Sequence, residues 1–391
     1  MRKLLVLSLT IFVVVMSELQ IAGMMPELAA DMHVTIDMVG LLVSAYSLGM
    51  AVGGPLLAYL LRHAAPKKAL LMLIAAYAGF ELLVPAVHQY WWILALRIIT
   101  GCLSGAAFGL SLSFGIRIAA DPARIGRSVS IVLGGMMAGT VIGLPASHAI
   151  AAAWDWQASF LMMGTAALTL FVVGLASLPD LSPVRTDDAA QDLLELRSRA
   201  LWSRYATSFL TIGAAYGSFS YFTPLLAEKT GLSSGVITVI LLGYGICSVV
   251  GNLIVGKLAD RNALVTLWVG QALIGFSLCL LALFADVAPA AITLVLLVGM
   301  SGVSMNPALA TRVAEVGGTG SLVTTLHTAV ITLGIAGGTA ASALAMRLLG
   351  DDPVVAMWVG VGLAAIAMAT LLAQRKPAGP MSGAGMMVRS Q

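Results

Sequence analysis

Three ionisable residues lie inside long apolar stretches of the sequence, where an ionised side chain is costly. Glu18, Glu81 and Arg97 interrupt runs that otherwise hold almost no charge. A charged group at the centre of a bilayer costs at least about 2.5–3.5 kcal/mol, so such a residue usually has a partner or a function. Burial raises the pKa of a carboxyl group and a nearby cation lowers it. We therefore predict that Glu18 lies near Arg97 and carries a proton at physiological pH.

Glu81 and Arg97 are predicted to belong to the same network, because the three residues fall at a similar depth. Each lies several residues from the same end of its run, roughly 8–11 Å below that boundary at 1.5 Å per residue. The alternative is a static ion pair that fixes helix packing. For Glu81 a further alternative is a position at the membrane interface.

The runs that hold these residues predict an all-α membrane protein. Of the 391 residues, 59% are hydrophobic and 10% are charged, whereas a soluble chain has about 25% charged residues. A membrane span needs about 20 apolar residues, and a run of that length in lipid must be helical. Twelve such runs are predicted, at 4–25, 37–61, 69–87, 92–116, 128–152, 157–178, 203–226, 235–256, 264–286, 290–311, 321–347 and 354–373.

The positive charges indicate the orientation of the chain. With the N-terminus in the cytoplasm, the 21 Lys and Arg residues fall in cytoplasmic segments or helix ends, except for Lys229, Arg347 and the intrahelical Arg97. Such an excess of cytoplasmic cations is typical of membrane proteins. We therefore expect a multi-pass protein with both termini in the cytoplasm.

The longest polar interval divides the chain into two halves. Residues 181–201 are predicted to form a cytoplasmic linker with a short surface helix, since acidic residues precede basic ones there. The interval separates a six-helix half at 1–180 from a second at 202–375, with a cytoplasmic tail at 376–391. The fifth and eleventh runs both carry closely spaced glycines, which include Gly139, Gly143, Gly334, Gly337 and Gly338. Two such halves around a central cavity are a common transporter plan.

Several motifs together resemble the major facilitator superfamily, and specifically its twelve-helix drug:proton antiporters. The motifs are Met25-Pro-Glu-Leu-Ala-Ala-Asp31, Arg97-Ile-Ile-Thr-Gly101-Cys-Leu-Ser-Gly105, Gly139-Thr-Val-Ile-Gly143-Leu-Pro145 and Gly256-Lys-Leu-Ala-Asp260-Arg261. The stretch 219–261 resembles the branch that contains actinobacterial chloramphenicol exporters and sugar-efflux proteins. The resemblance covers nearly the whole chain, and it implies the major facilitator fold and a location in the bacterial inner membrane.

The resemblance also implies roles for the glycine and charge motifs. The Gly139, Gly143 and Pro145 motif is expected at the contact between the halves, where Pro145 suits a hinge. Small residues of this kind let a facing helix approach closely. Asp260 and Arg261 after Gly256 are expected to act as a cytoplasmic latch. The first-half copy of this latch departs from the family, because Tyr59 and His63 stand where a glycine and an acidic residue are expected.

Candidate substrate-binding residues lie on the seventh, fifth and eleventh runs. The aromatic candidates are Tyr216, Phe219, Tyr221 and Phe222, and aromatic side chains suit an amphipathic ligand. An aromatic belt at the outer interface is the alternative for Tyr221 and Phe222. His148 and His327 are further candidates for the path, with an interfacial or packing position as the alternative.

These observations favour a proton-coupled antiporter that exports small amphipathic molecules, such as the drug chloramphenicol. An exporter of a sugar, a nucleoside or another metabolite is the first alternative. A non-transporting membrane sensor is the second, although it would call for an additional soluble domain.

Other classes of function are disfavoured. The formal net charge of +3 and the absence of a basic cluster give no sign of nucleic-acid binding. Cys102, Cys247 and Cys279 lie in separate apolar runs, so we expect neither a metal site nor a disulfide framework. No nucleotide-binding or catalytic motif occurs. The expected partners are therefore a small-molecule substrate, protons and lipid, without a cofactor or an enzymatic activity, and we expect a monomer.

Overall fold

The computed structural model describes residues 2–61, 63–118, 125–181, 198–317 and 321–374, and every regular element in these segments is a helix. The all-α prediction is therefore confirmed for the described residues. The linker helix predicted within 181–201 and the tail at 376–391 lie almost wholly outside them. The helices longer than seven residues are α1 (Arg2–Gly23), α2 (Met25–Met32), α3 (Ile36–Leu48), α5 (Pro66–Leu83), α6 (Tyr90–Ile118), α7 (Ile125–Ala153), α8 (Trp156–Ser177), α10 (Arg199–Phe219), α12 (Ser234–Leu283), α13 (Ala288–Ser301), α14 (Asn306–Gly317), α15 (Ser321–Leu349) and α16 (Pro353–Ala373).

Several of the predicted spans contain irregular turns. A π-helical turn at Gly49–Gly53 joins α3 to the short helix α4 (Gly54–Leu60), and a 3₁₀ turn at Val303–Met305 joins α13 to α14. The seventh span continues beyond α10 as α11 (Phe222–Pro224) and a π-helical turn at Leu225–Lys229. Irregular turns of this kind are tolerated inside a bundle, because neighbouring helices satisfy the freed backbone groups.

Ten helical stretches in the described segments are long and apolar enough to cross a membrane. One of them, α12, has 50 residues, and a helix of that length is about 75 Å long, more than twice the bilayer core of about 30 Å. Its backbone leaves the helical region at Asn262 (φ −160°, ψ 91°). The side-chain oxygen of Asn262 accepts a hydrogen bond from the N–H of Val265 at 3.0 Å, so Asn262 caps a new helix. The break separates the predicted spans 235–256 and 264–286.

The remaining difference from the predicted twelve spans concerns α10. This helix has 21 residues, the same number as α16, but several Ser and Thr residues lower its hydropathy and it is not among the ten. The count of twelve therefore rests on α10 as a span and stays a prediction.

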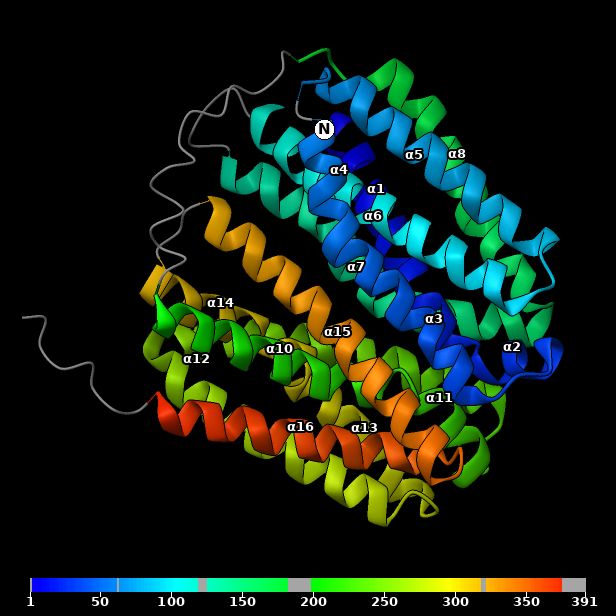
Figure 1. Ribbon diagram of the computed structural model, residues 1–391, viewed down its shortest axis with the longest axis vertical. Coiled ribbons are helices and arrows are strands. Elements are labelled where there is room, and N and C mark those ends of the chain that lie inside the picture. Colours follow the sequence, from blue (N-terminus) through cyan, green and yellow to red (C-terminus); the bar gives the residue numbers. More distant parts are fainter. Residues whose placement is uncertain (1, 62, 119–124, 182–197, 318–320, 375–391) are drawn as a thin grey trace, which may run out of the picture.

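The helices form two groups that follow the order of the sequence. In Figure 1, α1–α8 lie on one side of the molecule and α10–α16 on the other. Within the groups, α1 packs against α7 and α10 packs against α15. Between the groups, α3 packs against α15 and α7 packs against α12. We call α1–α8 the first group and α10–α16 the second group.

The two ends of the bundle carry different connections. The N-terminus lies at one end, and the short helices α2 and α11 lie at the other (Figure 1). The connection between α15 and α16 also lies at that other end, since its Asp351 is bonded to the start of α3. We call it the α2 end, and the opposite end the N-terminal end.

Candidate functional site

Residues of α1, α5 and α6 build a polar cluster in the apolar interior of the first group. Ser17, Glu18 and Gln20 come from α1, Glu81 from α5 and Arg97 from α6. Glu81 and Arg97 are not exposed at all, and Glu18 is 7% exposed. The structure therefore brings together the three intramembrane charges that the sequence singled out. Glu81 is buried inside the first group beside Arg97, and its membership of a proton-coupling network stays a prediction.

Arg97 is held from several directions. Its guanidinium lies 3.8 Å from the carboxylate of Glu81. It donates hydrogen bonds to the hydroxyl of Ser17 at 3.1 Å and to the carbonyl oxygen of Ser17 at 2.9 Å. It also lies over the ring of Tyr46, 4.0 Å from the centroid, where the aromatic face attracts a cation. Arg97 is thus fixed in place by α1, α3 and α5 together.

Glu81 is equally well satisfied. Its carboxylate accepts hydrogen bonds from the hydroxyl of Ser17 at 2.7 Å and from the amide of Gln20 at 3.4 Å. Gln20 is oriented in turn by Ser159 of α8, whose hydroxyl donates to its side-chain oxygen at 3.1 Å. These donors favour the ionised form of Glu81, which is the form that pairs with Arg97.

Glu18 has a different environment from Glu81. One of its carboxyl oxygens is buried without a hydrogen-bond partner, and among the described residues no cation lies within ion-pair distance of it. Its electrostatic neighbours are Arg97 and Tyr46 in the first group and Tyr216 in the second. The sequence predicted that Glu18 lies near Arg97, and Arg97 is its charged neighbour, but the ion pair of Arg97 is with Glu81. Depth along the helices did not distinguish the two.

The cluster contains two carboxyl groups and one guanidinium. If all three were ionised, the buried region would carry one uncompensated negative charge, which an apolar interior strongly disfavours. Glu81 is stabilised as a carboxylate by an ion pair and two donors, whereas Glu18 has neither. The arrangement therefore favours a neutral, protonated Glu18, and it allows that carboxyl group to exchange a proton once water or a new partner reaches it.

Three of the predicted aromatic residues of the seventh span, Tyr216, Phe219 and Phe222, pack together beside α12, whereas the hydroxyl of Tyr221 points to Thr339 of α15. Tyr216 is partly buried, Phe219 is 3% exposed, and Tyr221 and Phe222 are fully buried. The aromatic belt suggested for Tyr221 and Phe222 is therefore wrong. Phe219 stacks on Tyr244 of α12 with centroids 4.6 Å apart, and Phe222 meets the same ring edge-on at 5.7 Å.

The sequence analysis missed Tyr244, which completes this aromatic cluster. The signal was its position between Gly243 and Gly245 inside an apolar run. Gly245 brings α12 against α7, because a Cβ atom there would lie 2.6 Å from the Cα atom of Val141. Tyr244 is thus the aromatic residue of α12 nearest to the contact between the two groups.

The two candidate histidines occupy different positions. His148 is 2% exposed and lies at the α2 end, where its Nδ1 is 2.9 Å from the carbonyl oxygen of Gly23. Nδ1 donates to this carbonyl oxygen, and Nε2 is hydrogen-bonded to the hydroxyl of Ser234, 3.1 Å away on α12. His148 therefore joins the first group to the second.

His327 lies within the second group. It is hydrogen-bonded to Ser208 at 3.0 Å and stacks on Tyr205 with centroids 6.1 Å apart. Both partners come from α10, so this histidine holds α15 against α10. Its predicted position along a substrate path stays untested.

The glycine motifs mark close contacts between helices. A Cβ atom at Gly101 would lie 2.1 Å from the carbonyl oxygen of Tyr46, and one at Gly105 would lie 2.6 Å from that of Met50. These glycines let α6 approach the π-helical turn after α3. The predicted close approach is therefore correct at this motif.

The glycines of α7 face α1 rather than the second group. A Cβ atom at Gly139 would lie 3.0 Å from Val15, and one at Gly143 would lie 3.3 Å from Leu19, both on α1. Thr140 and Val141 of the same motif face Gly245 of α12 instead, so the motif as a whole lies where α7 meets the second group. The helix α7 continues through Pro145 to Ala153.

The glycines of α15 repeat this arrangement in the second group. Gly334, Gly337 and Gly338 face α10, where a Cβ atom at Gly338 would lie 2.2 Å from the carbonyl oxygen of Gly213. At the latch motif, Asp260 and Arg261 are exposed at the end of the first segment of α12. A Cβ atom at Gly256 would meet nothing within 4 Å, so this glycine makes no close helix contact in this conformation.

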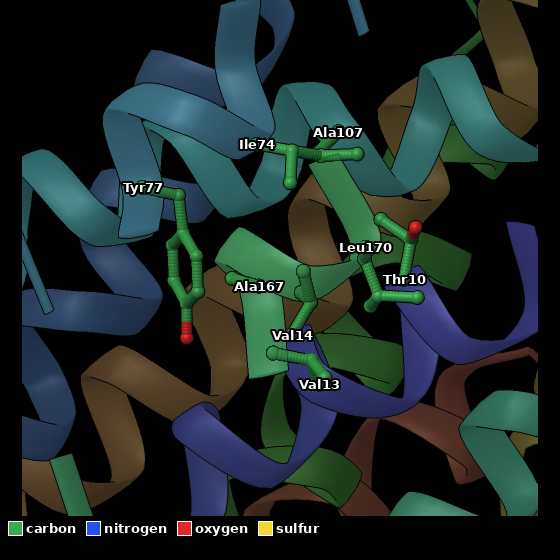
Figure 2. A pocket seen from close by; sticks show the side chains of 8 residues that line it. All are labelled: Thr10, Val13, Val14, Ile74, Tyr77, Ala107, Ala167 and Leu170. Carbon is green, nitrogen blue, oxygen red and sulfur yellow. The ribbon is translucent and has the colours of Figure 1, made fainter. Parts of the chain in front are cut away.

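Figure 2 shows a small cavity inside the first group, lined by side chains of α1, α5, α6 and α8. Its volume is about 10 Å³, which is about the smallest space that holds one water molecule. The lining is apolar except for Thr10 and Tyr77, and Tyr77 is an electrostatic neighbour of Glu81. The cavity lies inside the first group and is far too small for a drug, so the predicted central substrate cavity stays a prediction.

Comparisons with known proteins agree with the fold. The sequence model of the Major Facilitator Superfamily matches residues 7–339. The chain is 30% identical over 282 residues to the uncharacterized MFS-type transporter YtbD of Bacillus subtilis, covering 70% of both proteins. It is 29% identical over 331 residues to a chloramphenicol resistance protein of Streptomyces lividans, covering 82% of this chain and 83% of that protein. It is also 28% identical over 259 residues to the inner membrane transport protein YdhP of Escherichia coli, covering 66% of each.

This protein belongs to the Major Facilitator Superfamily, as its motifs predicted. It is therefore a multi-pass membrane transporter and not an enzyme. The similarity to a chloramphenicol resistance protein agrees with the predicted drug-efflux branch.

Proposed function

We propose that this transporter is a proton-coupled antiporter of the bacterial inner membrane that exports small amphipathic molecules, such as chloramphenicol. The observation that carries the proposal is the environment of the Glu18 carboxyl group. It is buried and has no counter-ion, because Arg97, the only cation of the cluster, is paired with Glu81. A carboxyl group of this kind binds a proton when it is closed off and releases it when a cation or water becomes available.

The orientation predicted from the positive charges is part of the proposal. The N-terminal end then faces the cytoplasm and the α2 end faces the outside. Hydrogen bonds join the two groups at the α2 end, from Thr223 to the carbonyl oxygen of Ala22 at 2.9 Å and between Ser44 and Thr339 at 2.7 Å. These contacts support a conformation that is closed to the outside.

The transport cycle follows from these positions. When the α2 end opens, Glu18 takes up a proton from outside and the substrate leaves. The proton is released to the cytoplasm when the N-terminal end is open and a new substrate enters. Substrate and proton thus use one conformational change in opposite directions. We propose that residues 1–180 and 202–375 act as the two moving halves, and that the protein works as a monomer.

Aromatic residues near Glu18 support an amphipathic substrate. Tyr216 is the partly exposed member of the aromatic cluster and an electrostatic neighbour of Glu18. A ligand there meets an aromatic face and a carboxyl group together. The similarity to a chloramphenicol resistance protein also favours a drug. A sugar, nucleoside or other metabolite remains the alternative substrate, and a non-transporting sensor the alternative of another class.

The test is drug efflux from cells that produce the parent protein or Glu18→Gln, with and without a protonophore. Glutamine keeps the size of the side chain but binds no proton, so we expect the protonophore-sensitive efflux to disappear. Glu315→Gln, which alters an exposed carboxyl group on α14, is the control and is expected to keep it. Unchanged, protonophore-sensitive efflux by Glu18→Gln would refute the proposed coupling. A panel of chloramphenicol, tetracycline, arabinose and nucleosides separates the substrate alternatives.

A further inference from the structure

The start of α3 is capped by a residue from the other group of helices. The N–H of Ile36 lies 3.4 Å from one carboxylate oxygen of Asp351, and the N–H of Asp37 lies 3.3 Å from the other. The first N–H groups of a helix have no partner within the helix and need an acceptor. Thr35, the residue in the N-cap position, makes no side-chain cap. Asp351, which follows α15, supplies the missing acceptor across the contact between the groups.

The backbone around Asp351 aims its side chain at α3. Asp351 has a left-handed backbone with φ 46°, and Gly350 before it has φ 112°. Their N–H groups both bond to the carbonyl oxygen of Met346, at 2.9 Å for Gly350 and 2.8 Å for Asp351. This arrangement terminates α15 in a fixed turn. The direction of the Asp351 carboxylate is therefore set by its own group of helices.

The other side of the turn is fixed as well. Asp352 accepts a hydrogen bond from the N–H of Val354 at 2.9 Å and so caps α16. Its second oxygen forms an ion pair with Lys229 at 2.7 Å. Neighbouring acidic residues thus have separate tasks, because Asp352 acts within the second group while Asp351 reaches across to the first.

From this geometry we infer that Asp351 is a positioning residue of the gate at the α2 end, whose carboxylate clasps the start of α3 and keeps the two groups together there. The inference deepens the proposed transport function and rests on it, since only a transporter requires these groups to separate. When the α2 end opens, the two N–H groups exchange Asp351 for water. The deeper bond between Ser44 and Thr339 then becomes accessible from that end.

The test measures how fast a reagent outside the cell reaches position 44. Ser44 is 8% exposed, and Ser44→Cys is introduced into a full-length protein whose Cys102, Cys247 and Cys279 are replaced by serine. Intact cells are treated with a membrane-impermeant maleimide, with Asp351 unchanged or replaced. Glycine is the informative replacement, because it accepts the left-handed backbone and removes only the acceptor.

We expect Asp351→Gly to accelerate labelling about fivefold, which corresponds to the loss of a typical N-cap. Asp351→Asn keeps one acceptor and tolerates the left-handed backbone, so its labelling rate is expected to lie near that of the parent. The matched control is Asp155→Gly, because Asp155 caps α8 within one group by accepting from the N–H of Ala158. This control is expected to leave the labelling rate unchanged.

Two results would refute the proposal that Asp351 keeps the α2 end closed. One is an unchanged labelling rate in Asp351→Gly, and the other is an equal increase in Asp155→Gly. If the glycine variant does not fold, Ile36→Pro removes a donor instead, at a first-turn position that suits proline, and it must also accelerate labelling. The measurement needs no substrate and no proton gradient. A faster labelling rate in a protein without export would therefore refute the proposed function alone.

Discussion

The carboxylate of Glu81 lies 3.8 Å from the guanidinium of Arg97, and neither side chain is exposed. This pair determines the chemistry of Glu18. Arg97 is the single cation of the cluster and is paired with Glu81, so Glu18 has no counter-ion. The structure therefore assigns different roles to residues that the sequence had grouped in one network. One role is the static ion pair, and the other is proton binding. Glu81 and Arg97 hold α1, α3, α5 and α6 together, whereas Glu18 is free to change its charge.

Replacing Glu81 by glutamine is expected to destabilise the protein. The change leaves Arg97 buried without its counter-ion, and breaking a buried pair in this way costs about 3–5 kcal/mol. Thermal unfolding in detergent measures the effect. Glu315→Gln breaks the exposed pair of Glu315 with Arg312 and is expected to cost less than about 1 kcal/mol. Equal unfolding temperatures for the two variants would show that the buried ion pair stabilises the protein no more than the exposed pair does.

The aromatic cluster is expected to divide into a binding residue and packing residues. Tyr216→Ala removes the partly exposed ring beside Glu18, and we expect drug affinity to fall by up to about tenfold with a small loss of stability. Phe222→Ala removes a fully buried ring and is expected to cost about 3–5 kcal/mol of stability. Drug binding and thermal unfolding are measured on both purified variants. Normal drug affinity in Tyr216→Ala contradicts the assignment of that ring to the substrate site.

Two glycines of the second group are expected to differ in their response to replacement by alanine, because the space around them differs. At Gly338 the new Cβ atom would lie 2.2 Å from the carbonyl oxygen of Gly213, so α15 and α10 must move apart at a cost of about 1–3 kcal/mol. At Gly256 nothing lies within 4 Å, and alanine there is expected to stabilise the helix by about 0.5–1 kcal/mol. Thermal unfolding of both variants tests the comparison, which fails if Gly256→Ala is the less stable of the two.

Acidic residues surround the clasp at the α2 end. Asp37 faces Asp351 from α3, and Glu228 of the π-helical turn after α11 and the hydroxyl of Tyr221 are further electrostatic neighbours of Asp351. Asp352 is its neighbour in sequence and is paired with Lys229. Partial burial raises the pKa of the Asp351 carboxyl group above its ordinary value, although the N–H of Asp37 opposes the rise. The charge of Asp37 adds to the rise.

Acid is therefore expected to favour the closed α2 end. An exposed aspartate in the open conformation has the ordinary pKa, so the closed conformation binds this proton more tightly. The extra stabilisation of the closed conformation by this proton is lost as the pH rises through the raised pKa, while the hydrogen bonds of the carboxylate to α3 persist. Spin labels at Ala30→Cys on α2 and Leu349→Cys on α15, in a protein without other cysteines, measure the opening as a function of pH. Asp351→Asn is expected to flatten the profile. A profile with the opposite slope would contradict the assignment.

The sequence allowed the positions of the helices to be predicted better than the directions in which their side chains point. Apolar runs and their polar intervals located the spans, and the cost of intramembrane charge singled out Glu18, Glu81 and Arg97. The pairing of Glu81 with Arg97 was not predictable in the same way, because lipid-facing and interior side chains are both apolar. Without a polar face to orient each helix, the depth of a residue was known but not its direction.

Contacts between distant segments were beyond the reach of sequence patterns. Asp351 lies in a short polar interval between two apolar runs, and nothing near it in the sequence indicates α3 as its partner. The glycines of α7 predicted a close approach correctly, but they did not identify α1 as the facing helix. Glycine spacing shows that one face of a helix lacks bulky side chains. Which helix packs against that face depends on how all the helices are arranged.

The ion pair has a consequence for biosynthesis. Glu81 and Arg97 lie in consecutive helices, α5 and α6, which are joined by a short turn. The two charges can therefore neutralise each other while this hairpin enters the bilayer, before the second half of the chain is made, and the insertion cost of each isolated charge is reduced. We expect Glu81→Gln to lower the yield of inserted hairpin in a glycosylation-based translocation assay. The pair that organises the finished transporter would then also be an early step in its assembly.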